Sequence, residues 1–163
     1  MIYEVQGDIL MSRAEVIAQG VSVNDPMSSG LSRKLQEKFP SMRARFIEWC
    51  EESKAEPGDV WLWKGTGKTK ILNLVVGEAP DPALGRPSRP DKIAVNRTFR
   101  ALNKLVVDER LSSIAMPMIG SGPGGIDWLE VRGMMHSQLS ELLIPVFVYV
   151  TELEGMLASE PGM

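Results

Sequence analysis

The chain has 163 residues, of which 44% are hydrophobic and 24% are charged, and its net charge is −3. These values are typical of one globular domain that can bury a core. A protein that coats nucleic acid needs a basic face for its phosphate contacts, so we expect no strong direct nucleic-acid binding. A small nucleotide is compatible with this charge, because backbone N–H groups can hold its phosphates.

Cysteine content and apolar runs indicate the compartment. Cys50 is the only cysteine, so an intramolecular disulfide is impossible and the reducing cytosol is the simplest location. The opening stretch MIYEVQGDILMSRAEV lacks the apolar core of a secretion signal, and no apolar run approaches the ~20 residues of a membrane span. We therefore expect a cytoplasmic protein that does not associate with a membrane. One histidine and one cysteine cannot supply a zinc ligand set, so we expect no metal site. We expect no cofactor either.

Strands are predicted where apolar or β-branched residues run almost without interruption, as in strands covered on both faces. In chain order these runs are residues 2–6, 16–21, 60–64, 71–76, 113–118 and 145–150. The third and fourth runs flank KGTGKTK, which indicates a hairpin.

Helices are predicted between these runs, where apolar residues recur at helical spacing. The four stripes are Leu31, Leu35 and Phe39; Met42, Phe46 and Cys50; Val95, Phe99, Leu102 and Val106; and Trp128, Val131, Met135, Leu139 and Leu142. Such stripes are typical of core packing. Alternating strands and helices predict an α/β protein with a mixed sheet between helices.

Two segments fall outside this pattern. Residues 77–91, GEAPDPALGRPSRPD, form a long proline-rich segment that is either a mobile lid or a disordered surface connection. Residues 153–163 are expected to be a short helical or frayed tail after a domain of residues 1–152.

Small residues precede the first predicted helix, in Met27-Ser28-Ser29-Gly30-Leu31. A helix that begins here presents free N–H groups and the positive end of its dipole, which together form an anion site. The alternative is that Ser28 or Ser29 only caps the helix.

A second glycine-rich stretch, IGSGPGGI at residues 119–126, lies between a predicted strand and a predicted helix. So many glycines favour a phosphate-binding loop over a simple turn. Asp127 with Glu130 matches a capping box for the following helix. The stretch also matches G-x-G-x-x-G, but a dinucleotide fold needs several further βα units, and only one helix and one strand follow.

A third segment, Gly7-Asp8-Ile9, follows the first strand. The carboxylate of Asp8 could accept a hydrogen bond from an adenine amino group. The alternative is an aspartate that only caps a turn or helix.

Together these segments resemble the macrodomain family. The strand followed by GDI, then VSVNDPMSSG, then MPMIGSGPGGIDW stand in the family's order and spacing, from about residue 2 to residue 150. The chain looks most similar to the branch that contains terminal ADP-ribose glycohydrolase and the DNA ADP-ribosyl glycohydrolase antitoxins. The stretch LSRKLQEKFPSMRARFIEWC resembles the helices of that branch.

This resemblance implies a three-layer α/β/α macrodomain fold that binds ADP-ribose, free or attached to a macromolecule, in a cleft. Asp8 would hold the adenine amino group, with Ile9 beside it and Tyr149 lining the adenine pocket. The first phosphate loop would be Ser29, Gly30 and Leu31. The second would be Ile119, Gly120, Ser121, Gly122, Pro123, Gly124, Gly125 and Ile126.

The chain departs from this branch at several positions. Its hydrolases have a lysine shortly after the strand that matches residues 71–76, and NLVVGE at residues 73–78 has none. Ser28 replaces a usual glycine, and Gly124 stands where the human-type enzyme has an aspartate. Ser22 matches an asparagine of the antitoxins, and Asp127 matches their aspartate position or is only a helix cap.

Cleavage of an ADP-ribosyl bond needs a group that activates a nucleophile or protonates a leaving group. The candidates are Ser22, Asn24, Asp25 and Asp127, with Lys92 as a further group from the proline-rich segment. His136 lies within a helix, which favours a surface or packing role. We expect a hydrolase of ADP-ribosyl groups on protein or nucleic acid. The alternatives are a non-catalytic reader of ADP-ribose, a phosphatase for its phosphate monoester and, last, a dinucleotide oxidoreductase.

Overall fold

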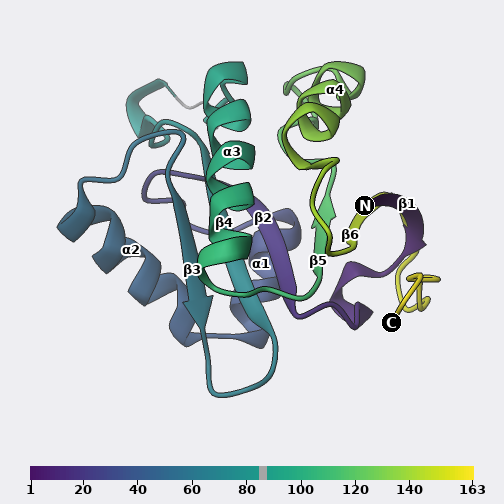
Figure 1. The fold of residues 1–163 in the computed structure, drawn as a ribbon. Helices are drawn as coiled ribbons and strands as arrows, with labels where there is room; N and C mark the ends of the chain where they lie inside the picture. Colours follow the sequence, from purple (N-terminus) through teal and green to yellow (C-terminus); the bar gives the residue numbers. More distant parts are fainter. Residues whose placement is uncertain (85–87) are drawn as a thin grey trace.

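A six-stranded mixed sheet forms the centre of the molecule (Figure 1). The computed structural model describes residues 1–84 and 88–163. The strand order is β1-β6-β5-β2-β4-β3, and only β3 and β4 pair antiparallel, as the predicted hairpin. The strands are β1 (Ile2–Gly7), β2 (Val16–Ser22), β3 (Val60–Lys64), β4 (Lys70–Gly77), β5 (Ile114–Pro117) and β6 (Val146–Glu152).

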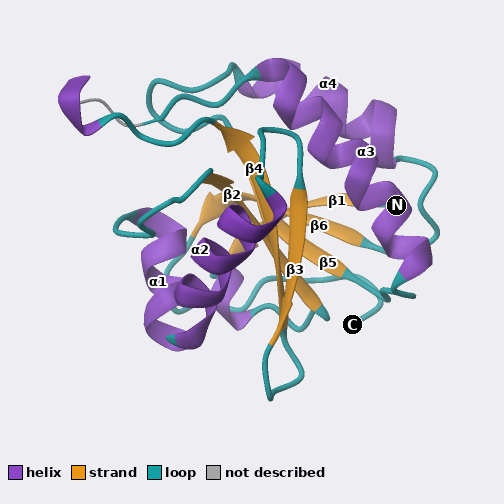
Figure 2. Ribbon diagram, turned by 90° about the vertical axis from the view of Figure 1, so that its left-hand side faces the viewer, coloured by secondary structure: helices purple, strands orange, loops and turns teal. Residues whose placement is uncertain are grey.

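Helices cover both faces of this sheet. Figure 2 shows α1 and α2 on one side and α3 and α4 on the other. Their bounds are α1 (Gly30–Lys38), α2 (Ser41–Ser53), α3 (Lys92–Asp108) and α4 (Trp128–Leu139), with short 3-10 helices η1 (Ile9–Met11) and η2 (Pro82–Leu84). The predicted three-layer α/β/α architecture is confirmed. Within the described residues, no helix is long and apolar enough to cross a membrane.

Each face of the sheet has its own hydrophobic core. Side chains alternate along β2, so Val16 and Ala18 pack with α3 and α4, while Ile17 and Val21 pack with α1 and α2. Burial on both faces explains why central strands such as β2 and β4 are apolar almost without alternation in the sequence.

The parallel strands place the functional loops together. β1, β6, β5, β2 and β4 all run in the same direction. Their carboxyl ends therefore meet at one edge of the sheet, where open α/β folds bind ligands. The loops after β2, β4 and β5 all start at this edge.

The C-terminal segment, residues 153–163, is neither helical nor frayed, contrary to prediction. Glu160 is 4% exposed, and its carboxylate accepts hydrogen bonds from Ser12 Oγ (2.6 Å), the Arg13 amide (2.8 Å) and the Tyr149 hydroxyl (2.9 Å). Its backbone also joins the end of β1, since the Asp8 amide donates to the Met156 carbonyl at 2.7 Å. These contacts fix the segment against the sheet, because a buried carboxylate is stable only with such donors.

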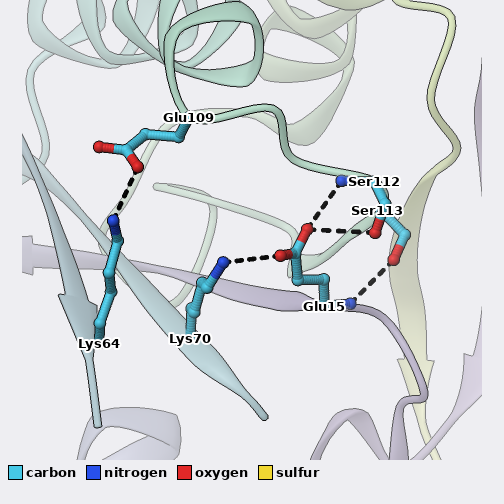
Figure 3. Close-up of polar contacts among 6 residues, drawn as sticks. All are labelled: Glu15, Lys64, Lys70, Glu109, Ser112 and Ser113. Atoms are coloured by element: carbon cyan, nitrogen blue, oxygen red, sulfur yellow. Dashed lines mark hydrogen bonds and ion pairs between the residues drawn. The ribbon is translucent and has the colours of Figure 1, made fainter.

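At the opposite ends of the strands, Glu15 joins the start of β2 to β4 and to the residues before β5 (Figure 3). Its carboxylate accepts from Lys70 Nζ at 2.7 Å, and from the amide of Ser112 at 2.8 Å and its hydroxyl at 3.1 Å. The Glu15 amide donates to Ser113 Oγ at 2.8 Å. Burial raises the pKa of Glu15, but the donors Lys70 and Ser112 outweigh it and hold the pKa below its ordinary value of 4.5.

Replacing Glu15 by glutamine should lower the free energy of unfolding by about 1 kcal/mol at pH 7, because solvent screens a side chain that is 24% exposed. The folded-state pKa is depressed, so this stabilisation is complete above the unfolded value of 4.5 and is lost as the pH falls through the folded value. Urea denaturation at neutral pH and at successively lower pH values below 4.5 should show the wild-type advantage shrinking. An advantage that does not change with pH would contradict this explanation.

Candidate functional site

The first loop, residues 23–29, joins β2 to α1 and is held by Asp25. One carboxylate oxygen accepts from the Ser22 amide at 2.9 Å, and the other accepts from the Met27 amide at 2.8 Å. Asn24 and Met27 both have φ near 52°, a left-handed conformation that few non-glycine residues adopt. Met27 is 1% exposed, so its side chain anchors the loop in the core. The loop thereby directs the start of α1 toward the edge of the sheet.

The start of α1 has backbone donors that find no partner in the described part of the chain. Ser29 is the N-cap residue, but its side chain makes no capping hydrogen bond. Among the described residues, no acceptor faces the amides of Ser29, Gly30, Leu31 or Ser32. Ser29 therefore occupies the N-cap position without capping the helix through its side chain, and these N–H groups are available to an anion, as at other helix starts.

The second loop, residues 118–127, joins β5 to α4 and is a tight glycine turn. The Gly125 amide donates to the Gly122 carbonyl and the Ile126 amide to the Gly120 carbonyl, both at 2.8 Å. A Cβ atom on Gly125 would lie 2.4 Å from the Gly120 carbonyl oxygen, so no side chain fits there. Within the described chain, the amides of Gly122 and Gly124 have no acceptor. This loop therefore supplies further backbone donors.

A cleft of about 560 Å³ lies between the two loops. The predicted site residues that line it are Ser22, Asp25, Ser29, Leu31, Ile119, Gly120, Gly122, Pro123 and Gly125. Gly30, Ser121, Gly124 and Ile126 belong to the same loops but are not among its lining residues. The proline-rich segment contributes Gly77, Pro80, Ser88 and Pro90. Its role as a lid stays a prediction, and its residues 85–87 lie outside the described residues.

The three residues expected at the adenine lie outside this cleft lining. The Asp8 carboxylate caps η1 by accepting from the Leu10 amide at 3.0 Å, and it also accepts from the Gly155 amide at 2.9 Å. Ile9 is buried in the core. Burial raises the pKa of Tyr149, whose hydroxyl donates to Glu160. The adenine role of all three stays a prediction.

The other candidate groups are not among the residues that line the cleft. Asp127 is exposed and caps α4, with its carboxylate 3.4 Å from the Leu129 amide. The predicted capping box is wrong in its second half, because the Glu130 carboxylate pairs with Lys92 Nζ at 2.8 Å instead. Lys92, the first residue of α3, therefore pairs with a residue of α4 and is not among the residues that line the cleft. His136 is exposed on α4, and Asn24 is exposed on the first loop.

Gln19 also lines the cleft, and the sequence reasoning missed it. It is 1% exposed on β2, and its Nε2 donates to Asn73 Oδ1 on β4 at 2.8 Å. Its Oε1 has no partner among the described residues. The sequence signal for this pair was a single polar residue within each of two apolar runs, Gln19 in VIAQGV and Asn73 in ILNLVV.

The chain is similar in sequence to known DNA ADP-ribosyl glycohydrolases. No family model matches the chain. The chain is 25% identical over 158 residues to a DNA ADP-ribosyl transferase–DNA ADP-ribosyl glycohydrolase fusion protein of Thermosipho africanus, with 90% of this chain aligned. It is 24% identical over 150 residues to a DNA ADP-ribosyl glycohydrolase of Thermus aquaticus, with 91% aligned. The chain spans 41% of the length of each of these relatives.

Solved structures agree in fold. The macrodomain of Thermus aquaticus DarG matches with a TM-score of 0.79 at 24% identity, over 92% of this chain and 98% of that one. Thermosipho africanus DarTG in complex with ADP-ribose matches with a TM-score of 0.80 at 23% identity, over 91% of this chain and 41% of that one. The chain therefore has the macrodomain fold. The chain is homologous, at low identity, to the macrodomains of DarG-type DNA ADP-ribosyl glycohydrolases.

Proposed function

We propose that the chain binds ADP-ribose, with the diphosphate between the first and second loops. The observation that carries this proposal is that amides without an acceptor in the described chain lie on both sides of one cleft. Ser29, Leu31, Ser32 and Gly122 line the cleft, and Gly30 and Gly124 stand next to them in the two loops. Two negative phosphates suit backbone donors at a helix start and in a glycine turn. The structural similarity to a protein solved with ADP-ribose supports the same ligand.

Calorimetric titration with ADP-ribose tests this proposal, with AMP and NAD as controls. We expect saturable binding with one site per chain and much weaker binding of AMP, which lacks the diphosphate. Equal affinity for AMP and ADP-ribose would contradict a diphosphate site, and no heat with ADP-ribose would overturn the proposal.

A hydrolase of ADP-ribosyl groups on DNA or protein is the activity that the named relatives favour. Ser22 supports it best, because it is 6% exposed and lines the cleft at the end of β2. The absence of a lysine in residues 73–78 favours the alternative of a non-catalytic reader. A phosphatase for the phosphate monoester of ADP-ribose is the remaining alternative.

These activities differ in the product that each releases. The wild-type chain should be incubated separately with an ADP-ribosylated oligonucleotide, an ADP-ribosylated protein and the phosphate monoester of ADP-ribose. Release of ADP-ribose from one of the first two supports a hydrolase, and release of inorganic phosphate from the third supports a phosphatase. Tight binding without any product identifies a reader. Replacing Ser22 by alanine should then lower turnover while keeping affinity, if Ser22 is catalytic.

A further inference from the structure

Asp25 has an unusual place for a carboxylate, because it lines a cleft that is proposed to hold an anion. Both of its oxygens point back into the first loop, where they accept from the Ser22 and Met27 amides at 2.9 Å and 2.8 Å. The Asp25 amide also donates to the Ser22 carbonyl at 3.2 Å. The carboxylate therefore binds backbone amides that lie before and after Asp25 in the chain.

The first loop needs these hydrogen bonds because its backbone is strained. Asn24 and Met27 both have positive φ, which costs free energy at non-glycine residues. Two charge-assisted hydrogen bonds from the Asp25 carboxylate offset that cost. Without them, the loop is free to relax toward ordinary backbone conformations.

The strained shape determines where α1 begins. Met27 is fixed in the core and is followed by two residues before Gly30, the first residue of α1. The unpaired amides of the first turn therefore keep their direction only while Met27 keeps its conformation. Since Asp25 binds the Met27 amide directly, it acts on these donors through the loop rather than through the ligand.

We propose that Asp25 is a positioning residue that holds the first loop in the conformation that presents the amides of α1 to a diphosphate. This inference rests on the proposed ADP-ribose binding. It assigns Asp25 a role different from the catalytic one considered on sequence grounds, because its two oxygens are already engaged by backbone amides.

Calorimetry on variants tests this inference. Replacing Asp25 by alanine should raise the Kd for both ADP-ribose and ADP by about tenfold or more, because two charge-assisted hydrogen bonds are lost. Asp25→Asn keeps one acceptor oxygen and should give a smaller rise. The matched control is Asp59→Ala, which removes a carboxylate that accepts from the Glu56 amide at 2.9 Å in a loop outside the cleft. Its Kd should equal the wild-type value.

The outcomes separate this inference from the proposed function. An unchanged Kd in Asp25→Ala or, if that variant does not fold, in Asp25→Asn would overturn the positioning role while ADP-ribose binding stands. Fewer binding sites per chain at an unchanged Kd would mean that part of the variant is unfolded while the folded part binds normally. This result would also overturn the positioning role. If the wild-type chain binds neither ADP-ribose nor ADP, the proposed function fails first and the inference fails with it.

Discussion

Replacing Gly122 by glutamate should weaken ADP-ribose binding by about 100-fold or more. A Cβ atom at this position meets nothing within 4 Å, so the fold can accept a side chain there. The new carboxylate would lie at the cleft, beside the proposed diphosphate. Like charges brought together at a binding interface cost several kcal/mol, which corresponds to this loss of affinity.

The control for this change is Gly67→Glu. A Cβ atom on Gly67 would likewise meet nothing within 4 Å, but this residue lies in the turn between β3 and β4, away from the cleft lining. The substitution adds the same charge to the chain and should leave the Kd unchanged. Calorimetric titration of both variants measures the difference. Retained affinity in Gly122→Glu would remove the second loop from the binding site.

Replacing Phe99 by alanine should lower the free energy of unfolding by about 3–5 kcal/mol. Phe99 is fully buried on α3, in the core between that helix and the sheet. Removing its ring leaves a cavity that its neighbours fill only in part. Urea denaturation followed by circular dichroism measures the loss, and ligand affinity per folded molecule should not change.

Val107 gives the matched control on the same helix. Its side chain is 71% exposed, so Val107→Ala should change the free energy of unfolding by less than about 0.5 kcal/mol. A loss at Phe99 no larger than the loss at Val107 would show that α3 is not packed on the sheet as described.

Much of the fold was predictable because its causes are local. Continuous apolar runs indicated the strands, and the KGTGKTK turn indicated the hairpin of β3 and β4. Apolar stripes at helical spacing indicated the helices on both faces. These signals depend on neighbouring residues alone, so the sequence carries them without knowledge of the folded chain.

The features that were not predicted depend on residues far apart in the chain. Glu160 binds Ser12, 148 positions earlier, so the composition of residues 153–163 could not reveal that this segment is packed. The pairing of Glu130 with Lys92 likewise joins two helices and replaces a local capping pattern. In the site, the glycine content indicated the second loop, whereas the small residues of the first loop left an anion site and a helix cap as alternatives. The Asp25 carboxylate points toward the amides of Ser22 and Met27, and this direction could be known only from the conformation of the loop.

An NMR titration with ADP-ribose, which records the amide ¹H–¹⁵N resonances, tests the proposed diphosphate site most directly. If the diphosphate lies between the two loops, the largest shifts should fall on the amides of Ser29, Gly30 and Leu31 and on those of Gly122 and Gly124. The amide of Gly67, in the distant hairpin, should not move. Shifts confined to other parts of the surface, or none at saturating ligand, would contradict a diphosphate site between these loops.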